Sequence, residues 1–320
     1  MNRWVDRWNA YWYPETTTVP LSISRIIMVA TQLVWFFPSL DKHLGLVEKH
    51  SDFINPQVII SAIAAVFPRQ EYFTASNITA LYWITIVAGI AALVGLFTRT
   101  SVFIFALGVW IFITHEYSYD DRHHTEAIFC IFLMLLAFSP SGERFALDAL
   151  IRRRRGHAVP ATTDLAMWPI KLAHVLLAMT YFSTGMSKLV AGWLAGISWM
   201  NGYTLQLYTF NDALNRNIPL GVWLSQQHGL AIALSVFTIL FEVFFFLSLV
   251  FPWTAPFFFV VGIFFHLGLY FTGGHDFFQH MVLLFILLLF IAPPWWQAWM
   301  DRIAGAIGLP GRARVAQPQM

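Results

Sequence analysis

Eight apolar segments, each long enough or nearly long enough to cross a bilayer, constrain this chain more than any other feature. They lie at about residues 22–40, 78–97, 101–114, 127–139, 167–187, 222–251, 254–272 and 280–294. Inside a membrane only helices and closed barrels satisfy their own backbone hydrogen bonds, and apolar runs near 20 residues are typical of helices. The segments therefore predict an all-α, polytopic membrane helical bundle of about eight spans.

The composition agrees with this interpretation and excludes several classes of protein. Hydrophobic residues make up 58% of the chain and charged residues only 11%, whereas soluble domains carry about 25% charged residues. A net charge of +2 is too small to indicate a nucleic-acid partner. The single cysteine, Cys130, excludes an internal disulfide and a cysteine-based metal site.

The segments outside the spans divide the chain. In residues 1–20, Trp and Tyr recur at helical spacing beside Arg3 and Arg7, which predicts an amphipathic helix at the membrane interface. Residues 21–294 form the expected transmembrane domain, and residues 295–320 are expected to be interfacial at first and then a disordered cytoplasmic tail. The short apolar piece 58–67 is too short to span and predicts a re-entrant or surface helix.

The distribution of Lys and Arg predicts the orientation, since basic residues accumulate on the cytoplasmic side. With eight spans, both termini share one side with eleven basic residues: Arg3, Arg7, Arg99, Arg144, Arg152, Arg153, Arg154, Arg155, Arg302, Arg312 and Arg314. The other side has six: Lys42, Lys49, Arg69, Arg122, Lys188 and Arg216. We therefore expect both termini in the cytoplasm, with the protein in a bacterial inner membrane.

Lys188 is the lysine at the non-cytoplasmic end of a spanning segment, within the stretch 181–203. The same depth is expected for several other titratable residues: His115, His123, His124, Glu126, His266, His275, Asp276 and His280. Glu242 is expected near mid-depth in the sixth span, and His174 in the cytoplasmic half of the fifth. Buried polar groups in membranes need partners, so we expect most of them to face one another across a cavity.

Other interpretations of these residues stay open. Any single histidine of this set is more often a link between helices than a catalytic group. Lys188 could equally extend its amine to the outer headgroups. A metal site would need His123 or His124 with Glu126, or His275 with His280, but these spacings match no zinc signature, and we expect no metal.

Four pieces of the sequence, in order, resemble one family. YFSTGMSKL followed by WMNGYTLQLY is similar to the segment that carries the base lysine of vitamin K-dependent gamma-carboxylase and of its bacterial relatives with the horizontally transferred transmembrane (HTTM) domain. RHHTEAIFCIFLMLLAFSP, FEVFFFLSL and FFFVVGIFFHLGLYFTGGHDFF resemble three further spans of that family. Together the four pieces indicate a resemblance over about residues 20–294.

The resemblance implies a chemistry and roles for particular residues. Lys188 matches the base that deprotonates a reduced vitamin K-like quinol, and His124 matches a histidine that assists it near the quinone. Five further residues match positions of the same family motifs or lie near them, and by this resemblance they are expected to bind the substrate: His123, His266, Trp199, Tyr203 and Glu242. His123 stands where the family has asparagine.

Two departures from the family weaken the expectation of protein glutamate carboxylation. The carboxylases carry a large domain after their spans, whereas a short tail follows Pro294 here. About six extra residues separate Lys188 from the motif Trp199–Tyr203, unless Trp193 is the proper match. The quinol-handling half of the chemistry is what we expect to remain.

Two functions from different classes follow. The first is a membrane protein that binds or oxidises a quinol in a pocket open to the non-cytoplasmic side, as an enzyme of quinol-dependent oxygenase or carboxylase-like lyase type. The second is a non-enzymatic scaffold or accessory subunit of a redox or secretion system, with a redox protein as partner. A transporter is disfavoured, because the sequence shows no inverted repeat.

Overall fold

The structure is a computed structural model. It describes residues 3–49, 54–55, 57, 60–62, 65, 73–119, 125–158, 160, 162–194, 198–291, 293 and 295–296. Within these ranges the regular structure is helical, apart from an isolated bridge between Thr16 and Thr163. The chain forms two compact units, an N-terminal unit, Met1–Lys171, and a C-terminal unit, Leu172–Met320.

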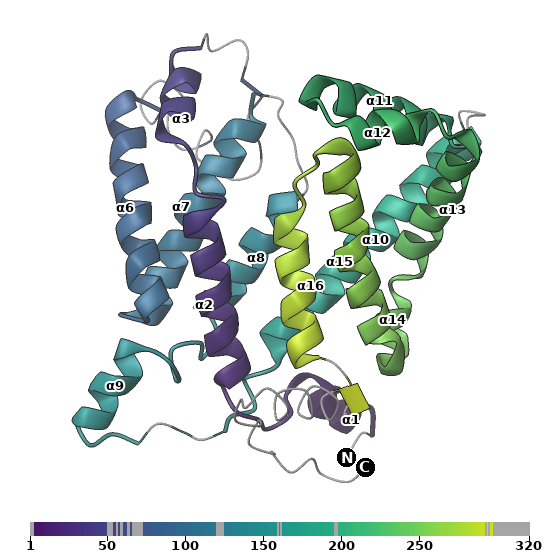
Figure 1. Ribbon diagram of the computed structural model, residues 1–320. Coiled ribbons are helices and arrows are strands. Elements are labelled where there is room, and N and C mark those ends of the chain that lie inside the picture. The colour runs from purple at the N-terminus through teal and green to yellow at the C-terminus, as the bar shows by residue number, and fades with distance from the viewer. Residues whose placement is uncertain are drawn as a thin grey trace. The chain divides into compact units, whose positions relative to one another are not determined.

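The N-terminal unit is built around four packed helices, α2 (Val19–Val34), α6 (Ala75–Val94), α7 (Thr98–Tyr117) and α8 (Thr125–Ala137) (Figure 1). α6 contacts α7 and α2, and α8 contacts both α7 and α2. Shorter helices flank them: α1 (Arg3–Trp12), α3 (Leu40–Val47) and α9 (Leu147–Arg154). The large side chains buried completely in this unit are mainly phenylalanine, leucine and isoleucine, as expected for a close-packed core, together with one arginine, Arg25.

α6 and α7 form a hairpin whose turn and crossing point both depend on glycine. Gly95 ends α6 in the left-handed conformation, with a φ of 69°, a common way to terminate a helix. Asp148 of α9 then accepts hydrogen bonds from the backbone N–H groups of Phe97 (2.9 Å) and Thr98 (2.7 Å). Farther along, Gly108 of α7 lies directly against Thr85 of α6, where a Cβ atom would clash. The two spans are therefore held together at the turn and near their middle.

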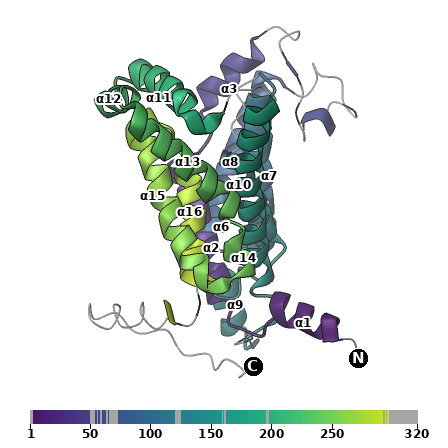
Figure 2. The ribbon, with the colours of Figure 1, turned by 90° about the vertical axis from the view of Figure 1, so that its right-hand side faces the viewer.

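The C-terminal unit contains most of α10 (Trp168–Leu194) together with α13 (His228–Phe244), α14 (Leu247–Val250), α15 (Ala255–Gly273) and α16 (Phe278–Phe290). α15 and α16 pack as a hairpin. Helices α11 (Tyr203–Arg216) and α12 (Pro219–Ser225) lie across one end of α13 and α15, and contact both (Figures 1 and 2).

Among the residues that the structure describes, four helices are long and apolar enough to cross a membrane: Ala75–Val94, Thr98–Tyr117, His228–Val250 and Pro252–Gly273. Three shorter apolar helices, Val19–Val34, Glu126–Ala137 and Phe278–Phe290, and α10 coincide with the remaining expected spans. The described residues thus confirm a helical membrane protein with four helices of spanning length. Eight spans and an interfacial position for α1 stay predictions.

One expected span differs from the structure at its beginning. The apolar run 222–251 predicts one span that is long enough to tilt or to begin as a surface helix. In the structure it is divided, because α12 ends at Ser225 and α13 begins at His228. Two glutamines, Gln226 and Gln227, separate the helices. The position of this break could not be predicted from hydropathy, because α12 contains leucine, valine and tryptophan and therefore continues the apolar run.

Candidate functional site

The candidate site is centred on Lys188, near the C-terminal end of α10. Its Nζ donates to both carboxylate oxygens of Glu242 on α13, at 2.7 Å and 2.6 Å. The side chains of Lys188 and Glu242 are only 16% and 6% exposed. Two oppositely charged groups at this depth compensate each other, since either one alone would be costly to bury.

A glycine brings the two helices close enough for this ion pair. A Cβ atom on Gly185 of α10 would lie 2.8 Å from the backbone nitrogen of Val243 and 2.9 Å from the Cβ of Glu242. Such distances are shorter than van der Waals contact, so only glycine allows α10 and α13 to approach this closely. The residue one turn before Lys188 therefore sets the distance to its partner.

A cavity of about 320 Å³ lies beside the amine of Lys188. Its walls are mainly apolar: Leu189, Gly192, Ser198, Trp199, Met200 and Ile239. Lys188 Nζ lies 5.4 Å from the centroid of the Trp199 ring, a cation–π distance. The volume is in the range of small-molecule pockets, and such pockets combine apolar walls with a few polar groups.

The first two residues of the motif WMNGY, Trp199 and Met200, form part of the cavity wall. Ser198 caps a short 3₁₀ helix, Trp199–Asn201, by accepting a hydrogen bond from the backbone N–H of Met200 at 3.2 Å. Gly202 follows with a φ of 82°, a conformation that favours glycine. A Cβ atom there would lie 2.7 Å from the backbone nitrogen of Ile232 on α13. Gly202 thus lets this segment rest on α13 and hold Trp199 over Lys188.

From Lys188 back toward its N-terminal end, α10 carries a row of polar side chains that repeats every seven residues: His174, Tyr181 and Lys188. Each bonds to a different helix. His174 Nε2 lies 2.8 Å from Ser248 Oγ, and Tyr181 Oη lies 2.6 Å from His266 Nε2. Residues seven apart share one face of a helix, so the row forms one polar face of α10 inside the unit.

Aromatic rings enclose the Tyr181–His266 pair. Tyr181 stacks on Phe245 with ring centroids 4.3 Å apart, and His266 stacks on Phe277 at 4.9 Å. The His280 ring lies 5.3 Å from that of His266. The carboxylate of Glu242 is near enough to interact electrostatically with Tyr181. Tyr181 was not among the site residues expected from the sequence, although its seven-residue spacing from Lys188 was a visible signal.

The structure brings together some of the expected site residues and leaves others apart. Lys188 and Trp199 line the cavity, and Glu242 lies behind Lys188 as its ion-pair partner. His266 belongs to the neighbouring Tyr181 pair. Tyr203 is 62% exposed and stacks on His228 at 4.5 Å. His123 and His124 lie outside the described residues.

Two of the residues proposed for a metal site, His275 and Glu126, have other contacts. His275 Nε2 lies 2.8 Å from Asp212 Oδ2 of α11, and Glu126 accepts a hydrogen bond from the hydroxyl of Tyr117. Among the described residues no three His, Cys, Asp or Glu side chains are grouped as metal ligands would be. At the candidate site itself, an amine and a carboxylate that can exchange a proton lie beside an apolar cavity.

Comparison with known proteins gives one match. The family model of the HTTM domain matches residues 13–295. No curated protein and no solved structure matches the chain. Because the family model covers most of the sequence and the helices have the length and hydropathy of membrane spans, the chain is an integral membrane protein that belongs to the HTTM domain family.

Proposed function

We propose that this protein binds a quinol in the cavity beside Lys188 and that Lys188 removes a proton from one quinol hydroxyl. The observation that carries the proposal is the ion pair itself: a part-buried amine, held by a buried carboxylate, that lines an apolar cavity under an indole ring. A quinol has a flat apolar ring and two hydroxyls, which suit such walls and such a base.

Glu242 gives the amine a way to become a base. While Lys188 carries three protons it can only donate, but Glu242 can accept one of them across a 2.6 Å contact. The neutral amine then takes the hydroxyl proton of the quinol, so that an O–H bond breaks, an N–H bond forms, and the electron pair stays on oxygen. In this proposal Lys188 is the catalytic residue, and Glu242 is a positioning residue that holds its proton.

The resemblance to the lysine segment of vitamin K-dependent gamma-carboxylase supports the same direction of chemistry. In that family the quinolate goes on to react with dioxygen, and the activity we propose by this resemblance is that of a quinol-dependent oxygenase or carboxylase-like lyase. His124 would assist near the quinone, with His123, His266, Trp199 and Tyr203 contributing to binding. The excess of arginine on the terminal side supports cytoplasmic termini and a bacterial inner membrane, with the cavity facing outward.

The experiment uses the purified protein in nanodiscs with a short-tailed naphthoquinol and a short-tailed benzoquinol. Quinones retained through purification are identified by mass spectrometry, and quinol-dependent oxygen consumption is measured separately. Lys188→Arg keeps the ion pair but replaces the amine with a guanidinium, which does not act as a base. We expect Lys188→Arg to retain quinol within about twofold while turnover falls by about 100-fold or more.

The matched control is Lys171→Arg, on the same helix but at its other end, where the side chain contacts Tyr11. It should leave both retention and turnover unchanged. The proposal is wrong if the wild-type protein retains neither quinol and consumes no oxygen with either. Full turnover in Lys188→Arg would exclude Lys188 as the base.

A second candidate, a non-enzymatic scaffold for a redox or secretion partner, is favoured by one face of α11. Tyr203, Leu207, Phe210 and Leu214 recur at helical spacing and are 62%, 60%, 41% and 60% exposed. Such apolar faces mark interaction sites or membrane-embedded surfaces. If the scaffold function holds, Leu207→Ser with Leu214→Ser removes a defined redox partner from the purified complex, measured by native mass spectrometry, while Lys188→Arg does not.

A further inference from the structure

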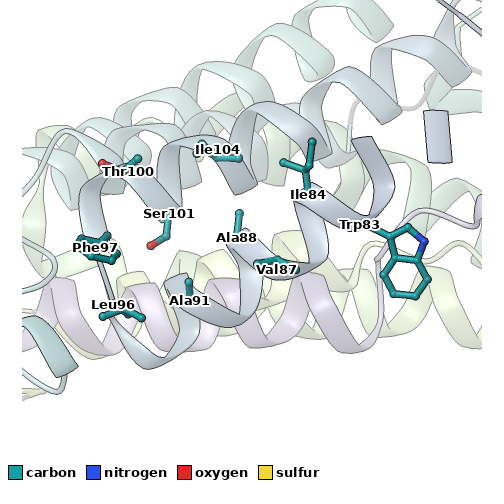
Figure 3. A pocket seen from close by; sticks show the side chains of 10 residues that line it. All are labelled: Trp83, Ile84, Val87, Ala88, Ala91, Leu96, Phe97, Thr100, Ser101 and Ile104. Carbon is teal, nitrogen blue, oxygen red and sulfur yellow. The ribbon is translucent and has the colours of Figure 1, made fainter. Parts of the chain in front are cut away.

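A groove of about 560 Å³ runs along one face of the α6–α7 hairpin in the N-terminal unit (Figure 3). Its floor consists of small side chains, among them Ala88, Ala91 and Ser101. Its walls and ends are bulky and exposed, with Val87 at 66% and Phe97 at 74%. The groove exists because α6 places alanines where its other outward positions carry large side chains.

The groove occupies one half of the hairpin's length. It begins at Trp83, near the middle of the 20-residue helix α6, and ends at Phe97, in the turn (Figure 3). On α7 it involves the first turns, from Thr100 to Ile104. The helical part of this stretch, from Trp83 to Val94, rises by about 17 Å at 1.5 Å per residue. One leaflet of a bilayer contributes about 15 Å of hydrocarbon, so the groove covers the depth of one leaflet.

The end of the groove at the turn lies beside one exposed arginine and next to a basic helix. Arg99 and Thr100 are exposed there on the first turn of α7. α9 is attached to the same turn through the bonds of Asp148 to Phe97 and Thr98. Its C-terminal end carries three consecutive exposed arginines: Arg153, Arg154 and Arg155.

The nearby acidic groups are already engaged. Asp148 accepts the hydrogen bonds of the α7 N-terminus, and Glu143 pairs with Arg152 at 2.9 Å. α9 also exposes Leu147, Leu150 and Ile151 beside its arginines, the mixture of apolar and basic side chains that is typical of helices at an anionic membrane surface. The groove therefore combines an apolar channel of one leaflet's depth with a cationic end at the headgroup level.

From this combination we infer that the α6–α7 groove binds one anionic phospholipid of the leaflet that contains the α6–α7 turn. One acyl chain lies in the channel over Ala88 and Ala91. The phosphate lies at Arg99 and the hydroxyl of Thr100, with the α9 arginines close by. The lipid completes the surface of the hairpin and is independent of the chemistry at Lys188.

The test measures phospholipid retained by the intact protein. The protein is purified in detergent, exchanged into mixed micelles with equal phosphatidylglycerol and phosphatidylcholine, and analysed by native mass spectrometry. Ala91→Phe fills the channel. Its matched control is Ile90→Phe, since Ile90 is 54% exposed on the same helix but does not line the groove. Arg99→Gln removes the charge, with Arg3→Gln on α1 as its control.

We expect about one phosphatidylglycerol per chain in the wild type and a loss of about tenfold or more in Ala91→Phe. Arg99→Gln should reduce the preference for phosphatidylglycerol over phosphatidylcholine by about fivefold, and neither control should change it. Lys188→Arg should retain the lipid, which separates this inference from the proposed function. The inference is overturned if the wild type retains the two lipids equally, or if Ala91→Phe retains as much phosphatidylglycerol as the wild type. It is also overturned if a second copy of the chain occupies the groove in place of lipid.

Discussion

Two buried polar pairs, one in each unit, show how differently this protein uses polar groups. Lys188 and Glu242 form a charged pair that borders a cavity. His43 and His115 form a pair of imidazoles, with their Nδ1 atoms 3.0 Å apart, and burial lowers the pKa of His43, which favours its neutral form. The second pair is packed between rings, with Phe73 stacked on His115 at 4.2 Å and Phe112 centred 4.7 Å from His43.

The difference separates a site from a structural contact. A charged pair beside a cavity can exchange a proton with a ligand, whereas two imidazoles enclosed by aromatic rings mainly connect α3 to α7. The pairs should also differ in energy. Breaking a buried ion pair leaves a full charge behind, while breaking a neutral hydrogen bond leaves only a polar atom. The following predictions test this comparison.

The largest effect is expected for Lys188→Met, which leaves the carboxylate of Glu242 buried without its partner. We expect a loss of about 3–5 kcal/mol in the free energy of unfolding, measured by chemical denaturation in detergent. Adding Glu242→Gln should restore most of that stability, since the uncompensated charge is then gone. If Lys188→Met lowers the free energy of unfolding by less than His43→Asn does, the comparison is contradicted, because the charged pair is then the weaker of the two.

A smaller effect is expected for Gly185→Ala, which adds a methyl group where α10 and α13 touch. The Cβ would lie 2.8 Å from the backbone of Val243, so the helices must separate, at a cost of about 1–3 kcal/mol. Gly268→Ala in α15 is the matched control, because nothing lies within 4 Å of its Cβ position. That change should be neutral or stabilising by up to about 1 kcal/mol. Equal unfolding midpoints for the two variants would refute the close approach.

The histidine pair predicts a dependence on pH. Burial, then His115 and Lys42, lower the pKa of His43 to about 3, whereas histidine in an unfolded chain has a pKa near 6.5. Below pH 6.5 the unfolded chain therefore binds a proton that the folded protein does not. Stability should be full above pH 6.5 and fall as the pH decreases, by about 1.4 kcal/mol at pH 5.5 from His43 alone.

Unfolding measured between pH 7.5 and 5.0 checks this, with His43→Asn as the comparison. Asparagine keeps a polar atom near the position of Nδ1 but does not titrate. The pH dependence of stability should decrease by about one proton in His43→Asn. If wild type and variant lose stability in parallel, His43 is not held neutral, and the contrast with the Lys188–Glu242 pair disappears.

The sequence predicted the C-terminal site better than the histidine pair. Lys188, Glu242 and Trp199 could be singled out because ionisable or motif-bearing residues are rare in apolar runs, and the structure places these three together. Their role in quinol chemistry stays a prediction. His43 could not be found, because it lies in a short polar segment where histidine is unremarkable. Its partner is 72 residues away, and no local pattern encodes that contact.

Spacing along one helix was informative where hydropathy was not. The polar row of α10 follows a seven-residue repeat that could be read from the sequence, yet the helices that face it could not. The break between α12 and α13 was also invisible to an average over apolar residues. The packing of α10 and the segment after it against α13 could not be predicted either. It depends on Gly185 and Gly202, which allow a close approach to α13, and a close approach in the tertiary structure leaves no periodic signal in the sequence.

The smallest effect is expected for Tyr181→Phe, which removes only the hydroxyl that contacts His266. The lost hydrogen bond should cost about 1 kcal/mol, and Ser248→Ala, which removes the hydroxyl bonded to His174, should cost about the same. The two variants differ in position, because Tyr181 interacts with the carboxylate of Glu242. If the polar face of α10 acts together with the Lys188–Glu242 pair, Tyr181→Phe alone should shift the pH profile of quinol-dependent oxygen consumption. The same shift in Ser248→Ala, or none in either, would limit the site to Lys188, Glu242 and the cavity they border.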